Sequence, residues 1–234
     1  MPTPMVRSTR SKTTLLSGHD WRRLRAWFKG HGRCLPWRQN ADPWRILVAE
    51  TLLHRTGANV VKTLYPIALK EFPSPRAVIA KRKQWITFAC KGGLFWRART
   101  FISACEILVK VHGGRVPSDR RELENLSGVG HYIASAVRCF GFGQREFITD
   151  TNTIRLAGRL AGKVLNPANH RTKRIQALTA RLNDNGRPPL PEDNYALLDL
   201  AATICKPRKP LCPKCPLCSS CRTARIQKRR RFLR

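Results

Sequence analysis

Residues 126–132 read Leu126-Ser-Gly-Val-Gly-His-Tyr132 and stand between two short segments with helical periodicity. Two glycines within five residues allow a tight turn whose backbone N–H groups face outward. The helix that follows directs its N-terminus at the same place, so the turn could hold a phosphate. A hairpin of this kind grips a DNA backbone without reading its sequence. A plain helical hairpin has the same spacing, so the pattern alone leaves both interpretations open.

The chain carries a large excess of positive charge. Its 234 residues include 45 Lys and Arg against 14 Asp and Glu, a net charge of +31. Such a chain needs a polyanionic partner, either nucleic acid or an anionic membrane surface, although genome composition explains part of the excess. No apolar run approaches the roughly 18 residues of a membrane span, and the N-terminal residues contain no apolar signal core. We expect an intracellular protein of the cytoplasm or nucleoid that binds nucleic acid.

Helical spacing of apolar residues runs through most of the chain, and no convincing two-residue alternation appears. The fold class predicted is therefore all-α. Residues 1–19 are expected to form a flexible basic arm, and residues 223–234 a disordered basic tail. Helices are predicted from residue 20 to about 29 and at 46–53, 60–68, 75–85, 98–109, 118–126, 131–140, 151–161, 172–184 and 191–204.

Four of the nine cysteines follow the spacing C-x6-C-x2-C-x5-C, and they are Cys205, Cys212, Cys215 and Cys221. Four thiolates are the ligand set of an iron–sulfur cluster or of a structural zinc. Zinc ribbons usually present two C-x2-4-C pairs a dozen or more residues apart, so this spacing favours a [4Fe–4S] cluster. A disulfide knot fits poorly in a chain without an export signal. Cys218 is a bystander or a spare ligand, and Cys34, Cys90, Cys105 and Cys139 are expected to be buried free thiols.

Two acidic residues stand out from the basic background. Asp150, 18 residues after Tyr132, begins a predicted helix in the segment Ile148-Thr-Asp-Thr-Asn-Thr-Ile-Arg155. Taken alone, it is best explained as a helix N-cap. Glu50 lies in the apolar segment 46–53, and burial raises the pKa of a carboxyl group and suits it to proton donation or water activation. A pair with His54, one turn later, is the other interpretation of Glu50.

The hairpin, the spaced Asp150 and the four-cysteine loop together resemble the helix-hairpin-helix DNA glycosylases of the endonuclease III and MutY group. The resemblance covers residues 20–222, and the segments Leu35-Pro-Trp-Arg38 and 46–53 are similar to the MutY branch. It implies two helical domains with a DNA-binding cleft between them. Residues 45–155 would form a six-helix barrel that carries the hairpin. Residues 20–44 and 156–222 would form the second domain, with the [4Fe–4S] cluster loop.

The resemblance also implies a reaction, the breaking of an N-glycosidic bond through an oxocarbenium-like transition state. Asp150 would stabilise the developing cation, and Glu50 would protonate the departing base. Tyr132 occupies the position where endonuclease III carries the lysine that attacks the sugar. Without that amine, we expect a monofunctional glycosylase with weak or no lyase activity. A tyrosine here resembles the Mig-type thymine-DNA mismatch glycosylases.

DNA contacts are expected from the hairpin and from two wedge residues. The hairpin contacts would come from Ser127, Gly128, Val129, Gly130 and His131. Arg55 matches the family position that fills the stack vacated by a flipped base, and Leu94 resembles the opposing wedge. Two features depart from the family pattern: Ser127 replaces the usual proline of the hairpin, and only a short basic segment follows Cys221. The second leads us to expect no 8-oxoguanine-recognition domain of the MutY kind.

Three functional hypotheses remain after this comparison, besides RNA binding through charge alone. The leading one is a monomeric base-excision-repair glycosylase that removes thymine or uracil mispaired with guanine in double-stranded DNA. Its rival removes adenine opposite 8-oxoguanine or guanine. The third is a non-catalytic iron–sulfur protein that only binds DNA, but such a protein would need to keep neither Glu50 nor Asp150.

Overall fold

The computed structural model describes residues 14–54, 56–91, 93, 95–165, 172–183 and 186–226. Within these residues all regular secondary structure is helical and no strand is present, so the all-α prediction is confirmed. No helix in the described part of the chain is long and apolar enough to span a membrane. The chain separates into two compact units, which we describe one at a time.

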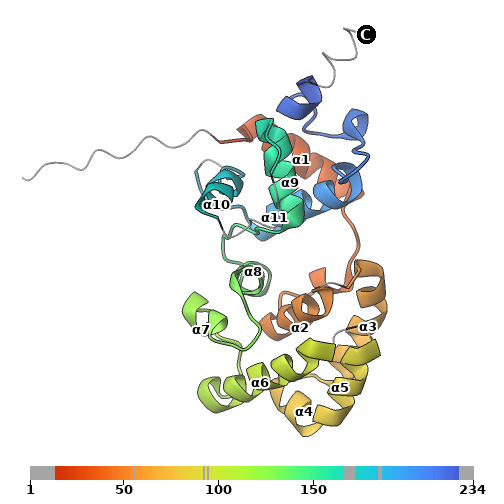
Figure 1. The fold of residues 1–234 in the computed structure, drawn as a ribbon, viewed down its shortest axis with the longest axis vertical. Helices are drawn as coiled ribbons and strands as arrows, with labels where there is room; N and C mark the ends of the chain where they lie inside the picture. The colour runs from red at the N-terminus through yellow and green to blue at the C-terminus, as the bar shows by residue number, and fades with distance from the viewer. Residues whose placement is uncertain are drawn as a thin grey trace, which may run out of the picture. The chain divides into compact units, whose positions relative to one another are not determined.

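The first unit, here called the hairpin unit, comprises Gly32–Ile148 and Leu190–Tyr195. Its α-helices, labelled in Figure 1, are α2 (Pro43–Leu53), α3 (Ala58–Glu71), α4 (Pro75–Ala80), α5 (Arg82–Lys91), α6 (Phe95–His112), α7 (Arg120–Glu124) and α8 (His131–Ala136). A short 3₁₀ helix precedes them at Pro36–Arg38, and α8 continues into a π-helical turn at Val137–Gly141. Both views show α4 and α5 lying along α6, and these are among the closest helix neighbours in the unit.

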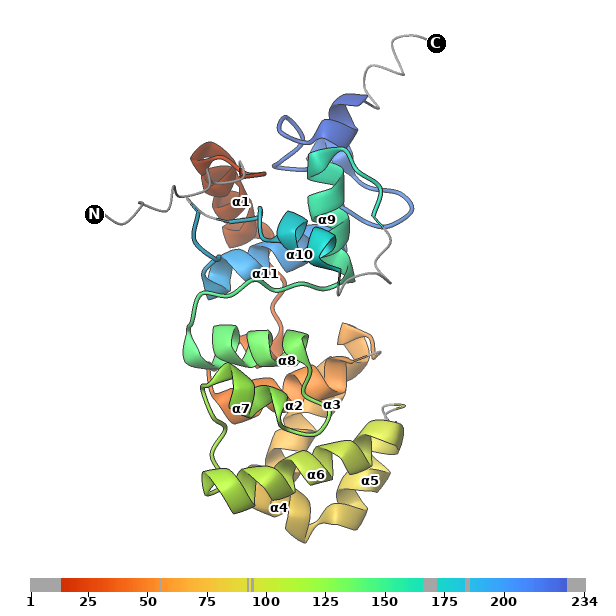
Figure 2. The same ribbon diagram turned by 60° about the vertical axis from the view of Figure 1, so that its left-hand side comes forward.

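The second unit, here called the cysteine unit, comprises the described residues of Met1–His31, Thr149–Pro189 and Ala196–Arg234. Its helices are α1 (Gly18–His31), α9 (Thr151–Ala161), α10 (Lys173–Thr179) and the later part of α11 (Pro191–Asp199), visible in Figure 2. A π-helical turn, Leu200–Ile204, extends α11 toward the cysteine-rich loop.

An aromatic cluster forms the core of the hairpin unit. The ring of Phe101 lies 4.7 Å from that of Trp85 and 5.6 Å from that of Trp44, measured between centroids. The indole N–H of Trp44 donates to the carbonyl of Phe72 at 3.2 Å, so this buried donor is satisfied. Buried aromatic rings with satisfied polar groups hold α2, α5 and α6 in fixed positions.

The core of the cysteine unit joins helices that are far apart in sequence. Trp21 and Leu24 of α1 pack with Leu156 and Leu160 of α9, and Leu200 follows α11. Cys215 and Cys221 pack against the same cluster. The cysteine loop is therefore continuous with the hydrophobic core of its unit.

Several element boundaries differ from the predictions. The helix predicted at 75–85 is two helices that break at Lys81, and Asp119 rather than Ser118 caps the helix before the hairpin. The side chain of Asp119 accepts from the amides of Arg121 and Glu122, as an N-cap does.

The predicted ends of the chain were partly wrong. Leu16 is 2% exposed and belongs to the core, and the Leu15 amide donates to the Arg181 carbonyl, so the flexible arm does not extend to residue 19. Residues 222–226 are helical, where a disordered tail was predicted from 223. Residues 1–13 and 227–234 lie outside the described residues. Cys34 and Cys90 are exposed rather than buried, whereas Cys105 and Cys139 are buried as predicted.

The boundaries between the two compact units lie after residues 31 and 148, whereas the sequence suggested boundaries after residues 44 and 155. The structural division assigns the whole of α9 and its cap, Asp150, to the cysteine unit. It also assigns residues 190–195 to the hairpin unit.

Candidate functional site

Asp150 is held at the N-terminus of α9 by a capping box. Its Oδ1 accepts from the amides of Asn152 and Thr153 at 3.0 and 2.7 Å, and from the Thr153 hydroxyl at 3.0 Å. Its Oδ2 accepts from Nδ2 of Asn152 at 2.8 Å. In return the Asp150 amide donates to the Thr153 hydroxyl at 2.9 Å. The carboxylate is therefore fixed in orientation, with its charge at the positive end of the helix dipole.

Hydrogen bonds continue from Asp150 to the cysteine loop. Asn152, which donates to Asp150, accepts from Nη2 of Arg155 at 2.9 Å through its Oδ1. Arg155 also donates to the carbonyls of Cys205 at 2.9 Å and Ala201 at 2.8 Å. Two side chains, those of Asn152 and Arg155, thus connect the candidate catalytic carboxylate to the backbone of the first cysteine.

Arg159, one turn further along α9, fastens the same loop. Its guanidinium donates to the carbonyls of Lys206 and Pro207, both at 2.7 Å, and lies 3.3 Å from Sγ of Cys205. Its own carbonyl accepts from the Thr223 hydroxyl at 2.8 Å. Both ends of the cysteine loop are therefore bound to a single residue of α9.

The cysteine side chains gather around one small cavity of about 30 Å³. Its lining includes Cys205, Cys212, Cys215, Cys218 and Cys221 together with Arg159 and apolar side chains. All nine cysteines are free thiols, so no disulfide knot is present. Burial raises the pKa of Cys215 to about 12.

No group of three or more His, Cys, Asp or Glu side chains within the described ranges is arranged as a metal-binding cluster. The five cysteines nevertheless share one cavity, and thiolates are the ligands that iron–sulfur clusters take. The donor set therefore fits such a cofactor in kind, and a cluster would have to draw these thiols together.

The hairpin between α7 and α8 depends on Gly128. This residue has a φ of +78°, in the left-handed region that favours glycine, and the Val129 amide donates to the Leu126 carbonyl at 3.0 Å. A Cβ at position 128 would lie 2.6 Å from Cγ2 of Thr100 on α6. The hairpin therefore packs against α6 at a distance that only glycine permits.

A network of charged hydrogen bonds connects the segments on either side of the hairpin. Glu146, 8% exposed, accepts from both Arg120 of α7 and Nε of Arg138, the latter at 2.6 Å. Arg120 also donates to the Ser135 hydroxyl of α8 at 3.1 Å. These bonds join the two helices that flank the hairpin, so they fix the position of the hairpin's backbone amides.

Glu50 lies in the last turn of α2 and is 7% exposed, so the predicted burial is confirmed. Glu50 interacts electrostatically with Tyr195. The Tyr195 ring stacks on that of Phe140 with centroids 4.1 Å apart. The Arg38 guanidinium lies 4.3 Å from the Tyr195 ring on which it rests. Burial raises the pKa of Tyr195, the Arg38 charge opposes that rise, and the Glu50 charge adds to it.

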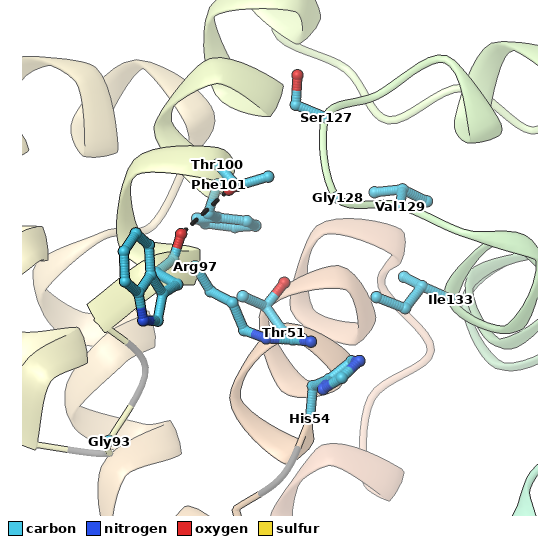
Figure 3. Close-up of a pocket in the computed structure, with 11 residues that line it drawn as sticks. Thr51, His54, Gly93, Arg97, Thr100, Phe101, Ser127, Gly128, Val129 and Ile133 are labelled. Carbon is cyan, nitrogen blue, oxygen red and sulfur yellow. Dashed lines mark hydrogen bonds between the residues drawn. The ribbon is translucent and has the colours of Figure 1, made fainter. Parts of the chain in front are cut away.

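A larger cavity of about 460 Å³ opens in the hairpin unit (Figure 3). It is lined by residues of α2 and its C-cap, the turn before α6, α6, the hairpin and α8: Thr51, His54, Gly93, Trp96, Arg97, Thr100, Phe101, Ser127, Gly128, Val129 and Ile133. Figure 3 shows Arg97, Thr51 and His54 directed into the same space. His54 therefore faces this cavity, which the sequence did not predict.

The remaining predicted site residues fall into three groups. Tyr132 is half-buried in the first turn of α8, while Gly128, Gly130 and His131 are exposed and Ser127 is half-buried. Val129 is 6% exposed, so its side chain packs inward and braces the turn. Arg55 and Leu94 lie outside the described residues.

Sequence reasoning missed the connection from α9 to the cysteine loop and missed Trp96. Arg155 and Arg159 are spaced four residues apart on α9 and therefore share one face of the helix, which is a usable signal. Nothing in the sequence, however, identifies the loop carbonyls that they bind. Trp96 is 87% exposed, and an exposed tryptophan cannot be told from a buried one by composition.

Comparison with known proteins gives consistent relatives, although no family model matches the sequence. Thymine-DNA glycosylase of Aeropyrum pernix is 37% identical over 194 residues, covering 81% of this chain and 87% of the relative. Thymine/uracil-DNA glycosylase of Methanothermobacter thermautotrophicus is 34% identical, covering 76% and 80%. Adenine DNA glycosylase of Mycobacterium tuberculosis is 34% identical, covering 90% and 67%.

Solved structures agree with these sequence relatives. A thermostable thymine-DNA glycosylase matches with a TM-score of 0.78 and 28% identity, covering 88% of this chain and 95% of that one. Endonuclease III in a non-covalent complex with DNA matches with a TM-score of 0.73 at 22% identity, which supports the fold. The capped Asp150, the glycine hairpin and relatives at up to 37% identity lead to one conclusion. The chain is a base-excision-repair DNA glycosylase of the helix-hairpin-helix superfamily of endonuclease III and MutY, close to the Mig-type thymine-DNA glycosylases.

Proposed function

We propose that the enzyme removes thymine or uracil mispaired with guanine from double-stranded DNA, as a monofunctional glycosylase. The observation that carries this proposal is the 37% identity to a thymine-DNA glycosylase over four fifths of the chain. Tyr132 supports it, because a phenol at this position supplies no amine for a Schiff base with the sugar. The protein would act as a monomer on chromosomal DNA in the cytoplasm or nucleoid.

In the mechanism we assign, the mispaired base leaves the stack before the chemistry begins. The bond between C1′ and the base nitrogen breaks, the base leaves with the bonding electrons, and positive charge develops on the sugar. Asp150 stabilises that charge through Oδ2, while three donors hold its Oδ1 in place. Water then adds to C1′ and loses a proton.

Glu50 is the proton-transferring group in this scheme. Its burial in the last turn of α2 keeps it away from bulk water, which favours exchange of its proton with the leaving base or the attacking water. The polar side chain of Tyr195 and the charged side chain of Arg38 form part of the surroundings of Glu50 within the hairpin unit. We assign these two residues a positioning role and no contact with the reacting atoms.

DNA binding is assigned to both units. The hairpin would hold a phosphate through backbone N–H groups around Ser127, Gly128, Gly130 and His131 at the start of α8. Arg55 and Leu94 keep their proposed roles as the stack-filling and wedge residues. The division into two helical domains with a DNA-binding cleft, as in the family, is part of the same proposal.

The cysteine unit would carry a [4Fe–4S] cluster on Cys205, Cys212, Cys215 and Cys221, with Cys218 as a spare thiol. The supporting observation is that all five side chains line one cavity fastened to α9 by Arg159. When bound, such a cluster supplies structural cross-linking of the loop. Iron and sulfide analysis, with an absorption band near about 400 nm from thiolate-to-iron charge transfer, would test it.

One assay tests the reaction. Purified protein is incubated with duplexes that contain G·T, G·U, A·8-oxoguanine, A·G or an oxidised pyrimidine, and each product is analysed with and without alkali. We expect strand cleavage at G·T and G·U only after alkali. Cleavage confined to the adenine pairs would establish the rival function, which the 34% identity to an adenine DNA glycosylase favours. Nicking without alkali would contradict the monofunctional assignment.

Asp150→Asn separates the catalytic role of Asp150 from its capping role. Asparagine caps a helix about as well as aspartate, so α9 should be retained while the negative charge is lost. We expect the single-turnover excision rate to fall by about 100- to 1,000-fold, the usual cost of removing an electrostatic stabiliser. Asp42→Asn, which alters the cap of α2 in the same way, is the control. Full activity in Asp150→Asn would refute the assignment.

A further inference from the structure

The cysteine loop contains more thiols than the proposed cluster needs. Cys205, Cys212, Cys215 and Cys221 make up the proposed ligand set, and Cys218 lines the same cavity. The Cys218 side chain is half-buried, as are those of Cys212, Cys215 and Cys221. It therefore lies within the group of thiols and not apart from them on the surface. The four-ligand assignment gives this fifth thiol no role.

The last four cysteines are regularly spaced. Residues 212–221 read Cys212-Pro-Lys-Cys-Pro-Leu-Cys-Ser-Ser-Cys221, so a cysteine recurs at every third position. Bacterial ferredoxins bind clusters with a C-x2-C-x2-C-x3-C run, whose first three cysteines belong to one cluster. Cys212, Cys215 and Cys218 match those three positions, with Cys205 as the remote fourth ligand. The loop therefore contains two overlapping ligand sets, which differ only in whether Cys218 or Cys221 completes the four.

The backbone of the loop repeats with the same period. The Cys215 amide donates to the Cys212 carbonyl at 3.1 Å. The Cys218 amide donates to the Cys215 carbonyl at 3.1 Å, and the Cys221 amide to the Cys218 carbonyl at 3.3 Å. Hydrogen bonds between residues three apart are those of a 3₁₀ turn, in which the side chains at i and i+3 are eclipsed. Successive turns thus bring the cysteines to one side of the loop, and all four side chains line the cavity.

The segment around Cys218 is anchored on both sides. Leu217 is 0% exposed and belongs to the hydrophobic core of the cysteine unit. The Ser220 hydroxyl donates to the carboxylate of Asp20 in α1. These contacts hold the backbone beside the cavity, so an exchange between Cys218 and Cys221 requires no unfolding of the loop.

Cys221 is the ligand that Cys218 is best placed to replace. Cys218 is its nearest cysteine along the chain, one turn away. Cys218 also interacts electrostatically with Cys212 and Cys215, the ligands that the two sets share within the loop. Cys205, by contrast, is 8% exposed at the end of the π-helical turn, and no other cysteine lies within six residues of it in the sequence. A reserve position therefore exists at one end of the loop only.

We propose that Cys218 is a reserve ligand, which binds iron of the cluster when Cys221 dissociates from it. In this exchange the Cys218 thiol loses its proton as its sulfur binds iron, and the sulfur of Cys221 leaves iron and takes up a proton. The number of thiolate ligands is unchanged and no electron is transferred. The inference rests on the proposed [4Fe–4S] cluster. It implies that this chain keeps its cofactor after the loss of one ligand.

Cluster content in single and double variants tests the exchange without an activity assay. Each full-length protein is reconstituted anaerobically with ferrous iron and sulfide, and iron, sulfide and the absorption near about 400 nm are measured. Cys221→Ala should retain about four irons per chain, whereas the double variant Cys218→Ala with Cys221→Ala should lose the band. Cys205→Ala should lose it too, because no reserve thiol is adjacent. Cys34→Ala, an exposed cysteine outside the loop, is the control.

Thiol labelling identifies the ligand in the folded protein. The reconstituted proteins are treated anaerobically with iodoacetamide, and the alkylated cysteines are located by mass spectrometry. In the wild type, Cys218 should be alkylated and Cys221 protected. In Cys221→Ala, Cys218 should become protected, because its sulfur is then bound to iron. Cys34 should be alkylated in both proteins, which checks that the reagent acts equally on each.

A chelator challenge gives a test that does not depend on the folding of Cys221→Ala. Cys218→Ala keeps all four ligands of the proposed set, so it is compared with the wild type after reconstitution. Both proteins are mixed anaerobically with an excess of an iron chelator, and the band near about 400 nm is followed. The band should decay faster in Cys218→Ala, because no second thiol then replaces Cys221 when it dissociates. Equal decay rates would overturn the reserve role.

Two further results would contradict the proposal. One is a folded Cys221→Ala protein that lacks the cluster as completely as Cys205→Ala, and the other is alkylation of Cys218 in reconstituted Cys221→Ala. A wild type that takes up neither iron nor sulfide would overturn the cluster and the reserve ligand together. A wild type that carries the cluster with these properties, yet excises neither thymine nor uracil, would refute the proposed reaction and leave the reserve ligand standing.

Discussion

Asp20 and Asp150 both lie at the N-terminus of a helix, but their different hydrogen-bond partners give them different roles. Asp20 is 4% exposed, and its oxygens accept from the amide and hydroxyl of Ser17 and from the hydroxyl of Ser220. Every one of these partners is structural, and Ser220 belongs to the cysteine loop. Asp150 is half-buried: three donors bind its Oδ1, whereas Oδ2 accepts from Nδ2 of Asn152 and can accept a further interaction from a substrate. The same residue type therefore ties elements together in one place and is available to a substrate in the other.

The charge on Asp20 makes a testable contribution to stability. Burial opposes ionisation, but the hydrogen bonds from Ser220 and Ser17 outweigh it, and the pKa of Asp20 is lowered. A carboxyl with a lowered folded-state pKa stabilises the protein above its unfolded pKa, near about 3.9, and loses that contribution as the pH falls through the folded value. Asp20→Asn should therefore cost about 1.5–3 kcal/mol at pH 7.

Urea unfolding of the wild type and Asp20→Asn across pH 3 to 7 measures this contribution. The difference in the free energy of unfolding should be constant above about pH 5 and shrink below about pH 4, because both chains then lack the charge. A difference that persisted unchanged at pH 3 would assign the effect to packing.

At the scale of elements, α9 connects the candidate catalytic carboxylate with the cysteine loop. Asn152 and Arg155 form the connection, and Arg155 binds carbonyls at two different positions of the segment after α11. A guanidinium can satisfy acceptors in several directions from one rigid plane, whereas an ammonium on a flexible stem cannot. The position of Asp150 consequently depends on the order of the cysteine loop.

Arg155→Lys should weaken this connection while it keeps the charge. We expect the single-turnover excision rate to fall by roughly 10-fold or more, as is typical when an outer partner of a functional group is removed. The free energy of unfolding should fall by about 1.5–3 kcal/mol for each charged hydrogen bond lost. Arg82→Lys, a side chain that is 56% exposed in a surface pair with Glu106, is the matched control. A wild-type rate in Arg155→Lys would show that Asp150 is positioned by its capping box alone.

The hairpin is the second element whose geometry sets function. Gly128→Ala combines a left-handed backbone with a Cβ contact of 2.6 Å to Thr100, so it should cost about 1–3 kcal/mol for the strain and more for the clash. Thermal unfolding and the affinity for duplex DNA should both fall. Adding Thr100→Ser removes Cγ2 and should recover only the part due to the clash.

Gly130→Ala is the control for this substitution. A Cβ at position 130 meets nothing within 4 Å, and Gly130 has a φ of −89°, which any residue adopts. Stability should change far less than in Gly128→Ala. Equal losses in the two variants would contradict the role given to the close approach between hairpin and α6.

At the scale of the whole molecule, the net charge of +31 governs the encounter with DNA. Each phosphate that a Lys or Arg neutralises releases counterions, so affinity falls with salt in proportion to the number of such contacts. For roughly six to ten phosphate contacts, affinity should drop about 10³- to 10⁵-fold between 50 and 200 mM salt. Anisotropy titrations of an undamaged duplex over that range test this. A nearly flat dependence would mean that the excess charge does not face DNA.

The sequence predicted the interiors of helices better than the ends of the chain. The helix at 151–161 matched because its apolar spacing, its Asp150 cap and the Gly162 that ends it agree. The break at Lys81 and the packing of Leu16 were missed. Neither has a local signal: the first separates two helices of similar composition, and the second depends on a contact with residues far along the chain.

The sequence by itself determined the helical class, the hairpin, the two acidic candidates and the cysteine spacing, because each is a local pattern written in adjacent or regularly spaced residues. Burial of Glu50 followed from its neighbours for the same reason. Only the tertiary structure decided that Arg155 and Arg159 bind the cysteine loop, and that Trp96 faces a cavity closed by the hairpin. These features join residues some 30 to 50 positions apart, and such contacts depend on how helices pack, which no local pattern records.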